Sequence, residues 1–514
     1  MALIYLLSVS TVVLHHVIAI GPSVNSKLGV IHGKAAEYTF NGHEYSTEEF
    51  LGIPYAKAPV GPLRFKKPQP YGQFSEPFDA TRFGSACPQN NMMGIGVDSD
   101  NEDCLSLNVY VPKGNPDDGT GLAVMIFVHG GGFMVGSSSM VPGEILSAYG
   151  NIILVTINYR LGIFGFANTG DEHAEGNMAL WDQRLAIQWV NENIAAFGGD
   201  TSRITIFGES AGSVSVLMQG MFPDNKGLFQ NIIAQSGVPT MPIGVSPNNI
   251  PSLEYVANFL QCSTDETNSM FKCLQNVDTK TLMVKLAELG TDLDAMLKVQ
   301  FAPTIDNAFI KRPPIETVMM SKTEPTEEIT SLRSFRLING INTAEGAMWL
   351  PHVIGHVDDP NTAVISHEDM RNVHIGNMLL TLTMGQPVPE LLHSLVTYEY
   401  TDWSNPENAR LQYVKLMGDL FFNVPGAEFS HLHANDSNTS SWLYSFGARL
   451  DKPVLPTPTW IDGANHADEL LAVFGYVVPE EGPLAKMKGY SPPEWELNMA
   501  KRVMTYWSNF AKHG

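Results

Sequence analysis

Gly208-Glu209-Ser210-Ala211-Gly212 directly follows the apolar run Ile204-Thr205-Ile206-Phe207 and precedes a stretch with the pattern of a helix. This G-x-S-x-G pattern is typical of a sharp turn from a strand into a helix, which lifts one serine hydroxyl above a sheet. Glycine is expected on both sides of Ser210 because the strained backbone leaves no room for side chains two residues away. In a chain with 45 glycines the five letters alone are a weak signal.

A second motif upstream strengthens this interpretation. The apolar run 124–128 (VMIFV) leads into the glycine string 129–133 (HGGGF), and in esterases and lipases such strings supply amides that bind an oxyanion. We expect the backbone N–H groups of Gly131, Gly132 and Ala211 to receive the negative charge of a tetrahedral intermediate. A phosphate cradle is the alternative, but neither G-x-x-x-x-G-K-[ST] nor G-x-G-x-x-G occurs. Two parts of one mechanism therefore favour a hydrolase.

The composition excludes one class of partner. Lysine and arginine total 31 against 53 acidic residues, which gives a net charge of -22. Such a surface repels phosphate backbones, so nucleic acid is not an expected partner. The charge is ordinary for a soluble secreted protein, and attraction of cations is the more specific alternative.

The first 20 residues predict a secretory signal peptide. Apart from His15 and His16 they carry no charge, their apolar core (2–14) is short for a membrane span, and 17–19 (VIA) offers a small-residue cleavage site. We therefore expect a secreted, extracellular protein. An uncleaved anchor is the alternative, because no lysine or arginine precedes the apolar core. No later segment is apolar enough to predict a membrane span.

The cysteines and two sequons fit secretion. An even number of cysteines behind a signal peptide favours disulfides, and the short separations predict Cys87–Cys104 and Cys262–Cys273. Metal binding fits poorly, since neither pair has C-x-x-C spacing. Asn435 and Asn438 each begin an N-x-[ST] acceptor for glycosylation.

The pattern along the chain predicts an α/β fold. Strand-like runs alternate with helical patterns such as residues 179–197; the runs cover 123–129, 152–158, 203–207, 230–235, 336–339 and 441–446. This alternation predicts a large, mostly parallel central sheet with helices on both faces. Residues 240–330 have few strand signals and predict a helical cap beside the active-site rim. Without internal repeats or linkers, 21–514 is expected to be a single domain.

These residues resemble the type-B carboxylesterases, the carboxylesterase/cholinesterase group of the α/β-hydrolase fold. The likeness runs from 50–56 (FLGIPYA) to 506–510 (YWSNF), and its most specific parts are 102–110 (EDCLSLNVY), 158–162 (NYRLG) and 197–200 (FGGD). It implies the α/β-hydrolase fold and cleavage of esters. It does not imply the substrate, since the family includes esterases, lipases, cholinesterases and catalytically inactive adhesion proteins. It also implies two structural ion pairs, Arg64 with Glu102 and Arg160 with Asp182.

The remaining catalytic residues follow from the same resemblance. A serine nucleophile needs a base, and in this fold the acid and then the histidine follow the serine. Residues 463–470 (GANHADEL) resemble the histidine loop of the family, which makes His466 the expected base. Glu345, in 337–346 (LINGINTAEG), matches the acid motif, and Asp419 is its competitor. Glu209 either assists electrostatically or packs against the turn.

The leading hypothesis is a serine carboxylesterase that uses Ser210, His466 and Glu345 and forms an acyl-enzyme. The alternatives are an acyltransferase with the same intermediate, and a non-catalytic adhesion protein. Neither a cofactor nor a metal is expected, and the substrate is a small-molecule or lipid ester. In the cholinesterases that this chain resembles, a tryptophan in the loop between the first two cysteines binds the quaternary ammonium of choline. Here that loop, 88–103, contains no aromatic side chain, although Trp349 could substitute. We therefore expect a neutral ester to be cleaved at least as well as its choline isostere.

Overall fold

The structure, a computed structural model, describes residues 21–91, 96–114, 120–289, 299–321, 323–354, 364–382, 386–405, 409–435, 439–477 and 483–514. The predicted signal peptide, 1–20, lies outside the described residues. So does Asn438, one of the two predicted glycosylation sites.

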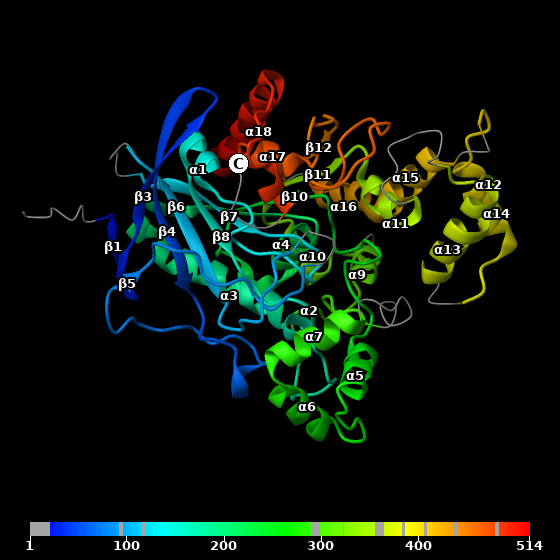
Figure 1. Ribbon diagram of the computed structural model, residues 1–514, viewed down its shortest axis with the longest axis horizontal. Coiled ribbons are helices and arrows are strands. Elements are labelled where there is room, and N and C mark those ends of the chain that lie inside the picture. The colour runs from blue at the N-terminus through cyan, green and yellow to red at the C-terminus, as the bar shows by residue number, and fades with distance from the viewer. Residues whose placement is uncertain are drawn as a thin grey trace, which may run out of the picture.

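A nine-stranded sheet forms the centre of the protein (Figure 1). In spatial order its strands are β12 (Ser441–Phe446), β11 (Arg336–Asn342), β10 (Asn231–Gln235), β9 (Gly199–Glu209), β7 (Leu122–Val128), β8 (Ile153–Ile157), β6 (Ser106–Pro112), β4 (His43–Pro54) and β3 (Lys34–Phe40). The strands from β12 to β8 pair in parallel. All six strand-like runs of the sequence are strands of this parallel part.

Helices follow or separate the strands. Those that contact the sheet include α1 (Glu144–Gly150), α3 (Met178–Asn193), α4 (Ala211–Met221), α16 (Val424–Ala434) and α18 (Glu494–His513). Helix α2 (Gly162–Phe166) packs on α3, and α17 (Glu469–Val473) packs on α18. Two further groups are α5 (Ile250–Phe259), α6 (Thr267–Asn276), α7 (Thr279–Leu289), α9 (Pro314–Met320) and α10 (Glu327–Leu332), then α11 (Leu350–Ile354), α12 (His367–Asp369), α13 (Gly376–Leu382), α14 (Glu390–Glu399) and α15 (Arg410–Gly418).

Strand β7 illustrates how the sheet is buried on both faces. Its side chains alternate, so that Val124, Ile126 and Val128 join the core shared with α3 and α4. Met125 and Phe127 join the core shared with α1, α17 and α18. A strand covered on both sides can be apolar at every position, which is why residues 122–128 read as a continuous apolar run rather than an alternating one. The predicted α/β architecture is confirmed.

One edge of the sheet is antiparallel and was not predicted. Strand β6 pairs antiparallel with β8, β4 with β6, and β3 with β4. A separate small sheet contains β1 (Ser23–Ser26), β2 (Gly29–His32) and β5 (Phe78–Asp79). Polar residues are interspersed along β3 and dominate the first part of β4, 43–49 (HEYSTEE), so these strands lack the long apolar run of a strand such as β7.

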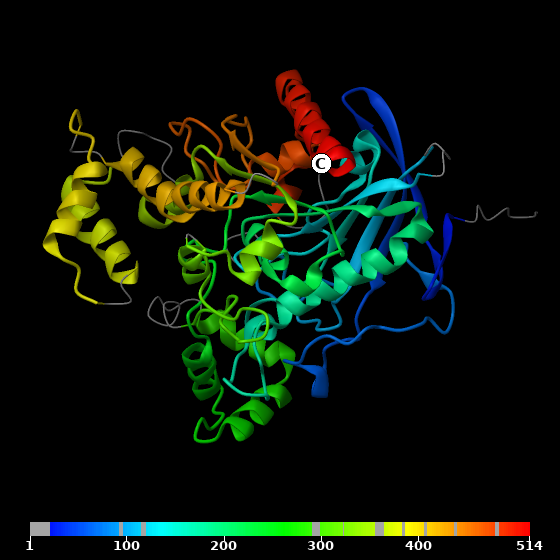
Figure 2. The same cartoon turned by 180° about the vertical axis from the view of Figure 1, so that it is seen from behind.

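Two helical regions project from the sheet, as both views show (Figures 1 and 2). The first carries α5, α6 and α7 and lies within residues 240–330, where a helical cap is predicted. The second carries α12, α13 and α14, and its apolar side chains form a third core cluster, with Leu350, Ile375 and Tyr413 among its members. The sequence analysis did not anticipate this second region.

Both predicted disulfides are present. Cys87 pairs with Cys104 and Cys262 with Cys273, with Cα–Cα distances of 5.0 and 5.7 Å. Asn435 is exposed directly after α16. Across the described ranges, no helix combines the length and apolar character needed to cross a membrane.

Candidate active site

Ser210 lies in a strained turn between a strand and a helix. Strand β9 ends at Glu209, α4 begins at Ala211, and Ser210 between them has φ 57° and ψ -122°. A Cβ atom on Gly212 would lie 2.0 Å from the carbonyl oxygen of Val128, and one on Gly208 would lie 2.5 Å from the backbone of Gly212. Side chains cannot fit there, which confirms the expected need for glycine on both sides of Ser210. The serine side chain is half-buried and borders a cavity.

The glycine string places free amides beside this turn. It follows β7, and Gly131 and Gly132 have φ values of 102° and 62°. A Cβ on Gly131 would lie 2.2 Å from the carbonyl oxygen of Val135, so only glycine fits. Within the described residues, the amides of Gly131 and Gly132 donate to no other protein group. Ala211 is the first residue of α4, so its amide has no partner inside the helix.

His129, the first residue of the glycine string, is held in place by Tyr159. The Tyr159 hydroxyl donates to the carbonyl oxygen of His129 at 2.7 Å, and the two rings stack with centroids 4.3 Å apart. Burial lowers the pKa of His129 to about 4, so this imidazole is neutral at pH 7. His129 is thus part of the scaffold of the loop.

His466 and Glu345 form a buried pair. Nδ1 of His466 lies 2.6 Å from Oε2 of Glu345, and the backbone N–H of Asn342 donates to Oε1 of Glu345 at 2.8 Å. Both side chains are buried. Glu345 begins a short helical turn, η4 (Glu345–Trp349), directly after β11, whereas His466 lies on a loop before α17.

The competing acid lies elsewhere. Asp419 begins η6 (Asp419–Asn423), where it accepts hydrogen bonds from Asn423 and Tyr400 and lies 3.3 Å from the Lys415 ammonium. The structure places Glu345 rather than Asp419 at the histidine.

The other ring nitrogen of His466 faces Glu209. Nε2 lies 3.1 Å from Oε1 of Glu209, the residue that precedes Ser210. Among the described hydrogen bonds there is none between Ser210 Oγ and His466 Nε2. The structure therefore brings His466 into contact with Glu345, and its Nε2 contacts Glu209, the residue before Ser210, rather than Ser210 itself. Catalytic hydrogen bonds are often loose before substrate binds.

The carboxylates change the protonation of this histidine. Burial disfavours the charged imidazole, but Glu209 and then Glu345 outweigh burial and raise the pKa of His466 well above the ordinary value of 6.5. Burial also raises the pKa of Glu209, against the opposing effect of His466. His466, with its neighbouring carboxylates, therefore binds its proton more tightly than a solvated histidine does.

A third carboxylate, Glu469, was not predicted as a site residue. It is buried as the first residue of α17, accepts hydrogen bonds from Asn342 at 2.6 Å and Gln235 at 3.1 Å, and burial raises its pKa. The sequence holds it within the histidine loop, three residues after His466, but an acid at the start of a helix is usually solvated. The burial of Glu469 is a result of the tertiary fold and has no signal in the local sequence.

A cavity of about 490 Å³ opens beside Ser210. Gly132, Ala211 and Val214 border it near the serine, and apolar side chains from α7, among them Met283 and Leu286, form another wall. The described lining residues include no charged side chain and neither His466 nor Trp349. Trp349 instead stacks on Phe421, whose neighbour Phe422 lies against the His466 ring with centroids 4.7 Å apart.

The two predicted ion pairs are formed. Arg160 donates to Asp182 through Nε and Nη2, each at 2.7 Å, and both side chains are fully buried between β8 and α3. Arg64 pairs with Glu102 through Nε at 2.8 Å. Among the described residues, no group of three or more His, Cys, Asp or Glu side chains has the geometry of a metal site.

In this parallel sheet, Ser210 lies in the turn after β9, Glu345 follows β11, and His466 lies on a loop after β12. This arrangement defines an α/β-hydrolase. The chain order of serine, glutamate and histidine is the order of that fold.

Comparison with known proteins identifies the family. The sequence profile of the carboxylesterase family matches residues 21–514, and the chain belongs to this family. It is 34% identical to carboxylesterase 5A of Mus musculus over 529 residues, covering 100% of this chain and 85% of that protein. Identity is 33% to bile salt-activated lipase of Bos taurus (96% of this chain, 79% of that protein) and 34% to cholinesterase of Mus musculus (90% and 75%). The protein is a carboxylic ester hydrolase, as predicted.

Proposed function

We propose that this protein is a secreted serine carboxylesterase that cleaves neutral esters through Ser210, His466 and Glu345. The observation that carries the proposal is the buried 2.6 Å contact between His466 and Glu345, which orients the imidazole toward the turn that carries Ser210. The serine borders an uncharged cavity, where an ester can reach it.

Acylation begins when Ser210 Oγ attacks the ester carbonyl carbon. Nε2 of His466 takes the serine proton, so the imidazole must be neutral and must turn from Glu209 to Ser210. The carbonyl oxygen becomes an oxyanion, to which the free amides of Gly131, Gly132 and Ala211 donate, and one such donor lowers the barrier by about 3 kcal/mol. The intermediate collapses as Nε2 returns the proton to the leaving alcohol.

Deacylation repeats these steps with water. His466 takes a proton from water, which attacks the acyl-Ser210 carbonyl, and the same amides stabilise the second oxyanion. This intermediate then collapses, the bond to Ser210 Oγ breaks, Nε2 returns the proton to Oγ, and the carboxylic acid leaves. Glu345 keeps the proton of the neutral imidazole on Nδ1 and offsets the charge that the ring gains in each half-reaction. Glu209 stabilises the same imidazolium from the Nε2 side.

The position of the cavity favours a particular part of the substrate. The leaving alcohol must receive its proton from His466, so it lies beside the imidazole. The cavity is bordered by Ser210 and Ala211 but not by His466 in the described lining, so we assign it to the acyl group. Its apolar, uncharged surface fits the acid part of a neutral ester, including a long aliphatic chain.

Secretion and glycosylation are further parts of the proposal. Two disulfides are typical of an oxidising compartment, and residues 1–20 have the composition of a signal peptide. Asn435 is exposed, as an acceptor of a glycan must be.

The direct test uses the nucleophile and the base. Ser210→Ala and His466→Ala should each lower kcat for a p-nitrophenyl ester by at least about 10³-fold, because triad members act as a unit. An organophosphate should label Ser210 alone in the wild-type protein. Labelling of another serine, with Ser210 unmodified, would refute the triad. Product analysis with a competing alcohol separates hydrolysis from acyl transfer, since only the acceptor differs.

A further inference from the structure

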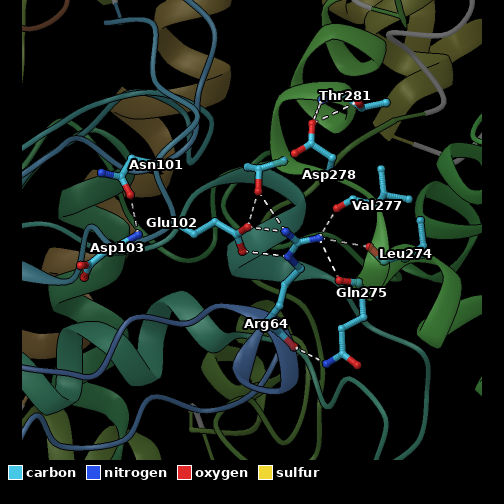
Figure 3. Close-up of polar contacts among 10 residues, drawn as sticks. Arg64, Asn101, Glu102, Asp103, Leu274, Gln275, Val277, Asp278 and Thr281 are labelled. Carbon is cyan, nitrogen blue, oxygen red and sulfur yellow. Dashed lines mark hydrogen bonds and ion pairs between the residues drawn. The ribbon is translucent and has the colours of Figure 1, made fainter.

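A buried arginine joins three segments that are far apart in the sequence (Figure 3). Arg64 follows the short turn η1 (Gly61–Leu63) and forms a two-pronged ion pair with Glu102, through Nε at 2.8 Å and through Nη2. Both side chains are buried. Such a planar, bidentate pair fixes the orientation of the guanidinium as well as its position.

The same guanidinium holds the junction between α6 and α7. Nη1 donates to the carbonyl oxygens of Gln275 at 3.0 Å and Val277 at 2.5 Å. The last carbonyls of a helix lack partners within the helix, and an arginine can satisfy them. Nη2 donates to Oγ1 of Thr279, the first residue of α7, at 2.9 Å, and this hydroxyl in turn donates to Glu102.

These contacts connect two walls of the acyl cavity. Glu102 lies two residues before Cys104, and the disulfide from Cys104 to Cys87 anchors the segment 88–91, which lines one wall. Helix α7 supplies another wall. A second tie joins the same walls, since Asn90 Nδ2 donates to the carbonyl oxygen of Met283 at 3.1 Å.

From this arrangement we propose that Arg64, Glu102 and Thr279 form a clamp that sets the selectivity of the cavity for large acyl groups. The inference rests on the proposed function of the same cavity. An acetyl group bonded to Ser210 is too short to need the α7 wall, whereas a long chain must pack against Met283 and Leu286. If α7 shifts away from residues 88–91, the long chain loses those contacts and the chemistry at Ser210 is unchanged.

Thr279 is the residue through which to test the clamp. Replacing Arg64 or Glu102 would leave a buried charge without its partner and endanger folding. Thr279→Val removes only a hydroxyl and leaves the ion pair intact. Thr281→Val is the matched control on the same helix, because the Thr281 hydroxyl is exposed and contacts Asp278 at 3.2 Å instead of the clamp (Figure 3). Thr279→Ser restores the hydroxyl and should restore the wild-type behaviour.

The experiment compares p-nitrophenyl laurate with p-nitrophenyl acetate, which share one leaving group. Thr279→Val should lower kcat/KM for laurate about fivefold, mainly through KM, as expected when the two partly buried hydrogen bonds of the Thr279 hydroxyl are lost, while acetate changes by less than about twofold. Thr281→Val and Thr279→Ser should keep the wild-type ratio of the two esters. Equal losses for both esters, or an unchanged ratio in Thr279→Val, would overturn the proposal.

A second measurement does not depend on catalysis. Hydrogen exchange should be faster for peptides of α7 in Thr279→Val than in Thr281→Val, and equal rates in the two variants would also overturn the clamp. Ser210→Ala serves as the reference for the proposed function. If Ser210→Ala retains activity, the triad fails, whereas an unchanged ester ratio in Thr279→Val with inactive Ser210→Ala refutes the clamp alone.

Discussion

His466 is held between two buried carboxylates, Glu345 at Nδ1 and Glu209 at Nε2, at 2.6 and 3.1 Å. In the proposed mechanism the first contact sets the tautomer of the imidazole. The second contact favours the protonated ring and occupies the nitrogen that the mechanism assigns to Ser210. General base catalysis requires the neutral imidazole, so under this proposal Glu209 lowers the fraction of active enzyme at neutral pH while it stabilises the imidazolium once that ion forms.

The first residue-scale prediction concerns pH. The raised pKa of His466 means that kcat/KM of the wild-type enzyme rises with pH through a midpoint above the reference value of about 6.5. Glu209→Gln removes the nearest charge that favours the imidazolium, so the midpoint should fall, by about one pH unit. A pH profile of kcat/KM from 5 to 10 measures this. A midpoint that does not move would show that Glu209 carries no charge beside His466.

The second residue-scale prediction separates the two candidate acids. Glu345→Gln should lower kcat by orders of magnitude, since the amide can neither accept the Nδ1 proton in the same way nor offset the ring charge. Asp419→Asn should keep substantial activity, because Asp419 contacts Asn423, Tyr400 and Lys415. Steady-state kinetics of both purified variants, each checked for folding by circular dichroism, decides between them. The reverse ranking would assign the acid to Asp419.

Among the elements, α1 carries a buried acid against the antiparallel edge of the sheet. Glu144 is its first residue, and burial raises its pKa to about 8. Glu49 of β4 adds to this shift, and Lys34 of β3 opposes it. Tyr38 and Tyr110, whose own pKa values are raised by burial, complete the surroundings. The folded protein thus binds a proton at Glu144 more tightly than the unfolded chain does.

This difference predicts how stability changes with pH. A group whose pKa is raised on folding stabilises the protein below its unfolded pKa, and that stability is lost as pH rises through the folded pKa. The free energy of unfolding should therefore fall between about pH 5 and 9, by on the order of a few kcal/mol from this group.

The neutral variant Glu144→Gln tests this linkage. In this variant the free energy of unfolding should fall less between pH 6 and pH 9 than it does in the wild type, as measured by urea unfolding at the two pH values. Glu37→Gln, on the exposed face of β3, is the control and should unfold as the wild type does. If the free energy of unfolding falls with pH as much in Glu144→Gln as in the wild type, Glu144 is not the cause of the fall.

At the scale of the whole molecule, the net charge and the cavity affect a cationic substrate in different ways. A charge of -22 attracts cations from a distance, whereas the described lining of the acyl cavity has no charged group. Trp349, the ring that could substitute, stacks on Phe421 and is not among the described lining residues of this cavity. Long-range attraction raises the local concentration of a cation but supplies no binding face for it.

We therefore expect butyrylcholine to be cleaved no better than the uncharged 3,3-dimethylbutyl ester of the same acid. Any residual preference for choline should vanish in about 1 M salt, where the Debye length is about 3 Å. Measuring kcat/KM for both esters at low and high salt checks this. A preference above about tenfold that persists in high salt would reveal a local cation site.

The sequence by itself determined the parallel half of the sheet and the turn at Ser210. Both depend on local pattern: apolar runs such as 122–128 can be satisfied only by burial on both faces, and only glycine fits two residues before and after the strained serine. The disulfides were also readable, because each closes a short loop. The antiparallel edge was not, since β3 and β4 lack such runs.

Only the tertiary structure decided what surrounds the proposed catalytic residues. Glu345 and His466 are 121 residues apart, and Arg64 and Thr279 are 215 apart. No local signal distinguishes Glu345 from Asp419, or a solvated Glu469 from a buried one. The family resemblance pointed to Glu345, but whether a carboxylate touches His466 depends on how the loops after β9, β11 and β12 converge. That convergence results from packing the sheet and its helices together, which local sequence does not specify.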